Sequence, residues 1–320
     1  MAKKKISKGK KQFTTRQLII ISLLITTLTI SIFLLFYYFL WASTIKFSFK
    51  AAIVDQLESA FENQSFVENV TQILQQYNFT VMHNRSAEIN VNFYKNLPKS
   101  NSGVIIFRVH SAIRNSTNVV DFFTSERYKD KLYEEYGDAL SVAWLPWEPG
   151  IYYFAIGPKF VKFMDGVFPK SVVIAMGCNS LNGTTMAQAF IDRGAKLYIG
   201  WTGSVSIGDS DKATLKLLEL LFIQNMTIKD AVNQCNRIQF EYPGRLDYFP
   251  KGADVDNEKV WDLVLDSISQ SSVLPNLGES TFFMFAPFRV ALLLESSNCP
   301  FIVFGDNVIE VRSKRVSRTF

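Results

Sequence analysis

The chain has 320 residues, a formal net charge of +5 and 48% hydrophobic residues. The positive balance does not indicate nucleic-acid binding, because seven Lys and Arg residues lie in the first sixteen positions, and without them the net charge falls from +5 to −2. The sequence contains no zinc-type spacing of Cys and His, no P-loop and no G-x-G-x-x-G. We therefore expect no nucleic-acid partner, no metal and no cofactor.

A basic tail and a long uncharged segment open the chain. Residues 1–16 contain no acidic residue, and residues 17–42 contain no charge. About 20 apolar residues cross a bilayer as a helix, so 17–42 is predicted to be a transmembrane anchor, with the lipid bilayer as its partner. The alternative is a cleavable signal peptide, but its apolar region has only about 7–15 residues. The positive-inside rule predicts a single-pass protein of the cell membrane, with a cytoplasmic tail and an extracellular chain after Ser43.

Seven Asn-x-Ser/Thr sequons follow the predicted anchor. Each alone is a weak motif, but together they fit an exported domain that carries surface glycans. The alternative is an Asn-rich composition in a cell that does not glycosylate the chain. The sequons begin at Asn63, Asn69, Asn78, Asn84, Asn115, Asn182 and Asn225.

The segment after the anchor, residues 43–78, is predicted to be membrane-proximal and helical, because its apolar residues follow a helical spacing. Phe79–Met82 is predicted to be the first strand of a sheet, and Glu88–Phe93 a short extended segment. The remaining chain, about 280 residues outside the membrane, fits one domain with elaborations.

Two apolar runs rich in β-branched residues are predicted to be buried strands of a parallel sheet. Gly103–Val109 is followed by His110, and Val172–Met176 is followed by Gly177 and Cys178. If the strands are neighbours, His110 and Cys178 emerge together at the edge where open α/β sheets bind ligands. An imidazole can activate a thiol as a base and later act as general acid. This pattern predicts a Cys–His dyad.

The chain between the two strands is predicted to form loop and helix over Asn115–Tyr136 and a surface hairpin over Asp138–Phe154. After the cysteine we expect a helix over Met186–Arg193, a strand over Lys196–Gly200 and a Gly/Ser-rich loop over Trp201–Asp211.

Further helices are predicted after Asp211 and after the capping box that begins at Thr227. Glu241–Glu258 is expected to be a loop. Phe282–Leu294 and Phe301–Val311 alternate in hydropathy, which predicts antiparallel strands within a β-rich C-terminal extension, residues 276–320.

The stretches Ile105–Ala112, Val172–Leu181 and Met186–Val205 resemble the caspase–hemoglobinase fold of caspases, legumain, gingipains and CHAT-type proteases. In this fold a histidine ends one strand and a cysteine ends the next. The resemblance covers roughly Phe79 to Cys235 and is closest to gingipain-like and CHAT-type proteins. The family usually has glycine where this chain has Ser111, and Asn179 after the cysteine distinguishes the chain from caspases proper.

The resemblance implies a three-layer α/β domain over residues 79–275, with a mostly parallel central sheet and helices on both faces. It implies Cys178 as nucleophile and His110 as general acid and base, acting on a protein or peptide. The backbone N–H groups of Cys178 and Ser111 are expected to form the oxyanion hole. A specificity loop at the next strand end is expected to use Trp201, Asp209 and Asp211, with the two carboxylates selecting a basic side chain.

The cysteine count is three, which leaves one thiol unpaired in an oxidising exterior. Cys235 and Cys299 are the candidates for a disulfide, and Cys178 then stays free. An inert buried cysteine is the alternative for Cys178, because free cysteine packs as a small hydrophobe. The leading hypothesis is a membrane-anchored, outward-facing cysteine endopeptidase. The alternative is a non-catalytic cell-surface binding module of the same fold, in which exposed Trp144, Trp147 and Trp201 bind a protein or glycan.

Overall fold

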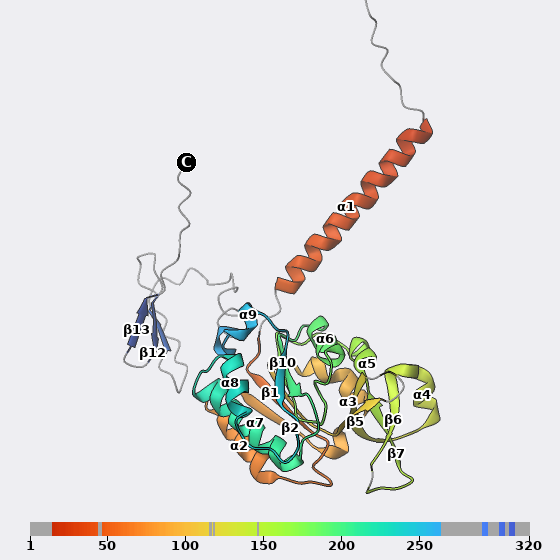
Figure 1. Cartoon of the computed structure of the whole chain (residues 1–320). Coiled ribbons are helices and arrows are strands. Elements are labelled where there is room, and N and C mark those ends of the chain that lie inside the picture. Colours follow the sequence, from red (N-terminus) through yellow and green to blue (C-terminus); the bar gives the residue numbers. More distant parts are fainter. Residues whose placement is uncertain are drawn as a thin grey trace, which may run out of the picture. The chain divides into compact units, whose positions relative to one another are not determined.

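The computed structural model describes residues 15–43, 47–114, 117, 119–145, 147–263, 290–293, 301–304 and 307–310. The chain divides into two compact units, Met1–Ile45 and Lys46–Phe320. The described part of the first unit is a single helix, α1 (Thr15–Ser43) (Figure 1).

Helix α1 contains a stretch, Ile19–Tyr37, that is long and apolar enough to cross a membrane. Large apolar side chains along this stretch, such as Leu24 and Phe33, are more than half exposed. A helix that is apolar all round avoids water only inside a protein core or a bilayer. The helix expected over residues 17–42 is confirmed, because α1 covers all of that range.

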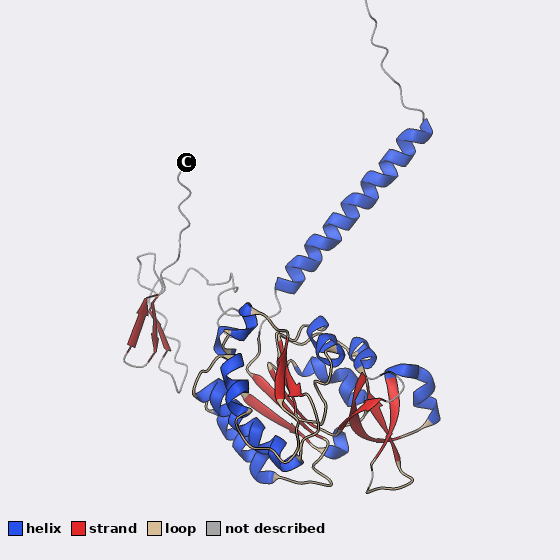
Figure 2. Cartoon of the chain, in the orientation of Figure 1, coloured by secondary structure: helices blue, strands red, loops and turns tan. Residues whose placement is uncertain are grey.

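The second unit is built on a six-stranded sheet, here called the main sheet, in the order β10-β9-β8-β3-β1-β2. Strands are drawn in red and helices in blue in Figure 2. Five strands are parallel, and β10 pairs antiparallel with β9. The strands are β1 (Lys50–Asp55), β2 (Thr80–Asn84), β3 (Val104–Arg108), β8 (Val172–Ala175), β9 (Leu197–Trp201) and β10 (Leu246–Phe249).

Helices cover both faces of the main sheet, because alternate residues of its central strands face opposite cores. In β3, Val104 and Ile106 pack with α2, α7 and α8, whereas Ile105 and Phe107 pack with α3, α5 and α6. The helices are α2 (Gln64–Gln75), α3 (Val91–Asn96), α4 (Asp130–Tyr136), α5 (Pro158–Phe163), α6 (Thr185–Asp192), α7 (Ile207–Leu218), α8 (Ile228–Cys235) and α9 (Ala253–Asp256). The predicted α/β architecture with a mostly parallel sheet is thus confirmed.

A second, four-stranded sheet is inserted between β3 and β8, in the antiparallel order β4-β5-β7-β6. Its strands are β4 (Ser111–Arg114), β5 (Val119–Arg127), β6 (Leu140–Trp144) and β7 (Tyr152–Ile156). The expected hairpin is β6–β7. A further antiparallel sheet consists of β11 (Val290–Leu293), β12 (Phe301–Phe304) and β13 (Asn307–Glu310), as the alternating pattern predicts.

The helical prediction for residues 43–78 is wrong in its first part. Lys50–Asp55 is strand β1, which lies between β2 and β3, and only Gln64–Gln75 is helical. A strand buried on both faces has a continuous apolar run, here Ala51–Val54, and such a run has no periodicity that separates it from a helix. The main sheet therefore begins before the expected boundary at Phe79.

Three other local predictions are also wrong. The expected loop over Glu241–Glu258 contains strand β10 and helix α9. Glu88–Phe93 is not extended, because the side chain of Asn90 accepts a hydrogen bond from the Phe93 N–H and so caps helix α3. The expected loop and helix over Asn115–Tyr136 contains the long strand β5. The buried Asp121 interrupts the apolar pattern that is typical of a strand. Its two carboxylate oxygens accept hydrogen bonds from the Arg114 guanidinium.

Candidate active site

His110 and Cys178 lie at one edge of the main sheet. Strands β3 and β8 are adjacent and parallel, and their last paired residues are Phe107 and Ala175. His110 and Cys178 each follow that pair by three residues, so the two side chains leave the sheet at the same level. This adjacency was expected from the sequence.

Both residues line one small pocket at this edge of the sheet. Its cavity volume is about 30 Å³, which is enough room for a water molecule. The apolar part of the lining includes Leu57, Met176 and Val205. No hydrogen bond joins the Cys178 thiol to the His110 ring among the contacts of the described residues. The Cys178 Sγ atom instead lies 3.3 Å from the Val205 carbonyl oxygen and 3.5 Å from the Val205 N atom.

The turn that presents Cys178 is held by neighbouring backbone groups. Asn179 takes a left-handed conformation, with φ of 58°, and its N–H donates to Gly203 O at 2.9 Å. The Ser180 hydroxyl donates to Ala175 O and accepts from the Trp201 N–H. These hydrogen bonds connect the turn to both β8 and β9, so the backbone that carries the thiol is held in one position.

The side chain of Ser111 contacts this turn directly. Its hydroxyl donates to the Cys178 carbonyl, with 2.5 Å between the oxygen atoms. Gly177 makes room for it, since a Cβ at residue 177 would lie 2.2 Å from Ser111 Oγ and 2.6 Å from Val109 O. The serine that departs from the resembled family thus links the histidine strand to the cysteine turn.

Two backbone donors near the thiol have no partner in the part of the chain that the structure describes. The Phe123 N–H donates to His110 O at 2.9 Å, so Ser111 and Phe122 form a non-hydrogen-bonded pair of the β4–β5 ladder. The Ser111 N–H therefore points away from β5. The Cys178 N–H also has no partner within the described ranges. These are the two groups expected to bind an oxyanion.

The imidazole of His110 is partly buried and surrounded by aromatic rings. Burial and the nearby positive charge of Arg108 lower its pKa from 6.5 to about 4. The ring is therefore neutral near pH 7, and a pKa this far below the operating pH makes it a weaker base than an ordinary histidine. Its Nε2 atom is buried without a hydrogen-bond partner among the described residues. The His110 backbone N–H donates to Gln56 Oε1 at 3.0 Å, which fixes the strand end.

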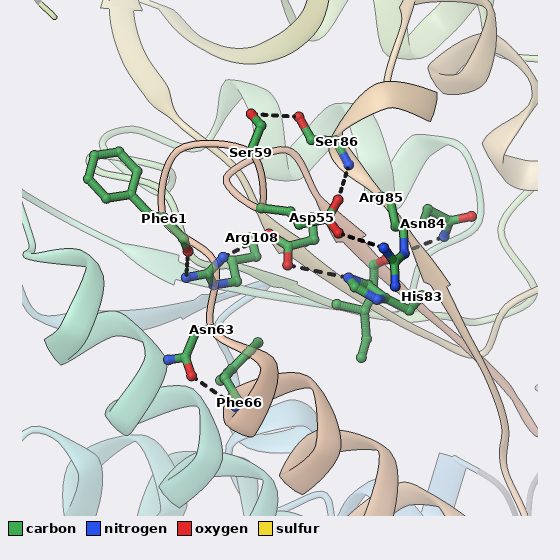
Figure 3. A network of polar contacts seen from close by, with 12 residues as sticks. Asp55, Ser59, Phe61, Asn63, Phe66, His83, Asn84, Arg85, Ser86 and Arg108 are labelled. Carbon is green, nitrogen blue, oxygen red and sulfur yellow. Dashed lines mark hydrogen bonds and ion pairs between the residues drawn. The ribbon is translucent and has the colours of Figure 1, made fainter.

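A buried ionic cluster contributes Arg108 and Asp211 to the pocket lining, and Figure 3 shows the part of it around Arg108. The Arg108 guanidinium donates to Asp55 Oδ1 at 2.8 Å and to both carboxylate oxygens of Asp211, at 2.9 and 3.0 Å. It also donates to the backbone carbonyl of Phe61 at 2.8 Å. His83 Nε2 lies 3.3 Å from Asp55 Oδ2. The cluster ties β1, β3 and α7 together, because buried charges are stable only when they are paired.

The three residues assigned to a specificity loop take other roles. Trp201 is fully buried at the end of β9, where its indole N–H donates to Ser210, so it is not an exposed wall. Asp211 does not cap a helix, because α7 begins earlier, with Ser206 as its N-cap. The Asp209 carboxylate accepts from the Glu241 N–H, and the Asp211 carboxylate accepts from Arg108. Both carboxylates are engaged, which argues against selection of a basic side chain.

The sequon asparagines differ in exposure. Asn69, Asn78 and Asn182 are exposed, Asn63, Asn84 and Asn225 are half-buried, and Asn115 lies outside the described residues. Cys235 is fully buried and forms no disulfide with Cys178, the other cysteine that the structure describes. Its candidate partner, Cys299, also lies outside the described residues, so the pairing stays a prediction.

The sequence pattern did not predict a role for Arg108 or Asp55, although each residue stands out in the sequence. Arg108 is a cation inside an otherwise apolar strand run, and Asp55 ends the apolar run of β1. A charge within a buried strand requires a buried partner of opposite sign. Asp55 was overlooked because its strand was assigned as helix.

No protein-family model matches this chain. No curated protein matches it either. The function is therefore inferred from the residues at this edge of the sheet.

Proposed function

We propose that this protein is a membrane-anchored cysteine endopeptidase of the caspase–hemoglobinase fold, with its main domain outside the cell. The observation that carries the proposal is the placement of His110 and Cys178 at the same level on adjacent parallel strands, in one shared pocket. A titratable group with a perturbed pKa in a pocket marks a candidate active site, and His110 is such a group. The histidine-first order and the helix α6 and strand β9 after the cysteine support the family resemblance.

The proposed reaction begins with the neutral form of His110. It takes the proton of the Cys178 thiol, and the sulfur attacks the scissile carbonyl carbon. The oxyanion is bound by the N–H groups of Cys178 and Ser111. His110 then gives the proton to the leaving amine as the C–N bond breaks, which leaves a thioester. Water, deprotonated by His110, hydrolyses the thioester and restores the thiol.

The small pocket supports a substrate with a small, uncharged side chain before the scissile bond. The cavity is small, and Asp211 in its lining is already paired with Arg108, so that carboxylate is not free to attract a basic side chain. The open backbone donors next to Cys178 suit a peptide carbonyl. Protein or peptide is therefore the proposed substrate class.

The proposed topology follows from α1 and the lysine-rich tail. A helix long and apolar enough to span a bilayer, preceded by positive charge, supports a single-pass anchor with a cytoplasmic N-terminus. Protease added to intact cells is expected to digest the main domain and spare the tail. Protection of the main domain would contradict this orientation.

A second candidate function is a non-catalytic surface module of the same fold. One observation favours it: the Cys178 thiol donates to the Val205 carbonyl and makes no hydrogen bond to His110. Trp144 and Trp147 are also exposed and available for a binding surface. In this case the Cys–His pair has no chemical role.

The deciding experiment uses the purified full chain in detergent micelles against a peptide library with small or basic residues before the scissile bond. We expect cleavage after small residues, loss of cleavage with Cys178→Ala, and retention with Cys235→Ala, which removes the buried thiol away from the pocket. Cleavage that survives Cys178→Ala, or no cleavage by the unaltered chain, would exclude the proposed peptidase and favour the surface module.

A further inference from the structure

Two aromatic side chains meet over the imidazole of His110. The ring centroid of Trp147 lies 5.0 Å from that of His110, and the centroid of Phe61 lies 6.0 Å away. The Phe61 and Trp147 rings are 5.4 Å apart and nearly perpendicular, at 88°. Phe61 comes from the segment between β1 and α2, and Trp147 from the β6–β7 hairpin. Two distant parts of the chain thus build one aromatic wall beside the histidine.

This aromatic wall, Phe61 and Trp147, is open to solvent. Phe61 is 38% exposed and Trp147 is 45% exposed, whereas Phe123, the third ring near His110, is only 7% exposed. A scattered exposed hydrophobic residue is ordinary. Two exposed aromatic rings that contact each other and a candidate general acid form instead a local apolar surface beside His110.

The wall is held in place before any ligand binds. The Phe61 carbonyl accepts a hydrogen bond from the buried Arg108, and Figure 3 shows the ring of Phe61 pointing away from that guanidinium. Trp147 precedes a loop residue, Glu148, whose carboxylate accepts from the Tyr153 hydroxyl on β7. A surface that is already ordered loses less entropy when it binds a side chain.

The chemistry of the proposed reaction identifies what the wall contacts. His110 must come within hydrogen-bond reach of the leaving amine nitrogen to give it a proton. That nitrogen belongs to the first residue after the scissile bond, and the side chain of this residue begins one carbon away from it. Groups packed on the imidazole therefore face that side chain. We infer that Phe61 and Trp147 bind the side chain of the first substrate residue after the scissile bond and select an apolar residue there.

This inference rests on the proposed peptidase function and adds its specificity. The test uses the full chain in detergent micelles and a series of peptides that differ only in the first residue after the scissile bond: Leu, Phe, Ala, Ser or Asp. Aromatic contacts of this kind are expected to raise kcat/KM for Leu and Phe about 10-fold over Ser. Trp147→Ala is expected to reduce that ratio about 3- to 10-fold, and Trp147→Phe to restore most of it.

Trp144→Ala is the matched control. Trp144 lies on the same hairpin and is 60% exposed, and no ring contact joins it to His110 among the described residues. Its substitution is expected to leave the Leu-to-Ser ratio unchanged. Two results would overturn this inference alone. One is an equal kcat/KM for all residues after the scissile bond, and the other is a Leu-to-Ser ratio of kcat/KM that Trp147→Ala leaves unchanged. Absence of cleavage by the unaltered chain would overturn the proposed function and this inference with it.

Discussion

The Ser111 hydroxyl donates a hydrogen bond to the Cys178 carbonyl at 2.5 Å, and this contact joins the ends of β3 and β8. Through it, the residue after the histidine fixes the peptide group of the cysteine. A neighbour of the proposed base thereby sets the position of the proposed nucleophile.

Ser111→Ala is expected to lower the free energy of unfolding by about 1 kcal/mol, because it removes one neutral hydrogen bond. It should also slow alkylation of Cys178, since the turn loses a support. Ser171→Ala is the matched control, because Ser171 donates to the Ser102 carbonyl at the opposite end of β8. We expect a similar stability loss there with no change in Cys178 reactivity; equal effects on reactivity would show that Ser111 has no positioning role.

Cys178 is expected to react with iodoacetamide near neutral pH much faster than Cys235. Cys178 is partly exposed, whereas Cys235 is fully buried and burial raises its pKa to about 12. Only the thiolate reacts, and at pH 7.5 roughly one Cys235 in 10⁴ to 10⁵ is ionised. His110→Ala should slow labelling of Cys178 and leave that of Cys235 unchanged. Mass spectrometry of labelled peptides measures both, and equal rates in the folded chain would contradict the dyad.

The stability of the domain is expected to fall as the pH drops from about 6.5 towards 4. The pKa of His110 is lowered to about 4 in the folded chain and is about 6.5 when unfolded, so the unfolded chain binds more protons within this window. The full shift corresponds to roughly 3 kcal/mol, an upper bound for a partly exposed ring. Denaturant unfolding across this range should show a shallower pH slope with His110→Gln, and an unchanged slope would exclude His110 as its source.

Arg108→Leu is expected to destabilise the fold by about 3–5 kcal/mol, because it leaves Asp55 and Asp211 as buried carboxylates without their cation. Lys99→Leu breaks an exposed pair with Asp165 and should cost far less, because water screens that pair. Urea unfolding measures both. Arg108→Leu should also raise the pKa of His110, measured by NMR, since the guanidinium charge helps to lower it; a fall in that pKa would refute the coupling.

Expression in a glycosylating cell is expected to modify Asn69 and Asn182 but not Asn63. Asn63 donates from Nδ2 to Asp211 at 2.8 Å, and its Oδ1 accepts from the Phe66 N–H at the start of α2. The side chain is therefore committed to the buried cluster, whereas Asn69 and Asn182 face solvent. Glycopeptide mapping gives the occupancy of each site, and a glycan on Asn63 would contradict the structure of this cluster.

The sequence sufficed to predict the two strands that carry His110 and Cys178, because their short apolar runs end in small polar residues. It did not identify β1, since an apolar run buried on both faces has no period that distinguishes strand from helix. The partners of Arg108 could not be predicted from the sequence either, because they lie in β1 and α7, which are far apart in the chain. The aromatic wall was missed for the same reason: Phe61 and Trp147 meet only in the folded domain.

The insertion of a complete sheet between β3 and β8 has a consequence for biosynthesis. His110 emerges from the ribosome long before Cys178, and the strand that carries Cys178 pairs with β3 only after β4, β5, β6 and β7 have been made. Pairing between strands so distant in the chain is slow relative to local folding. A nascent or truncated chain that ends before β8 therefore has the histidine without the thiol, and any chemistry of the pair is delayed until most of the domain has been translated.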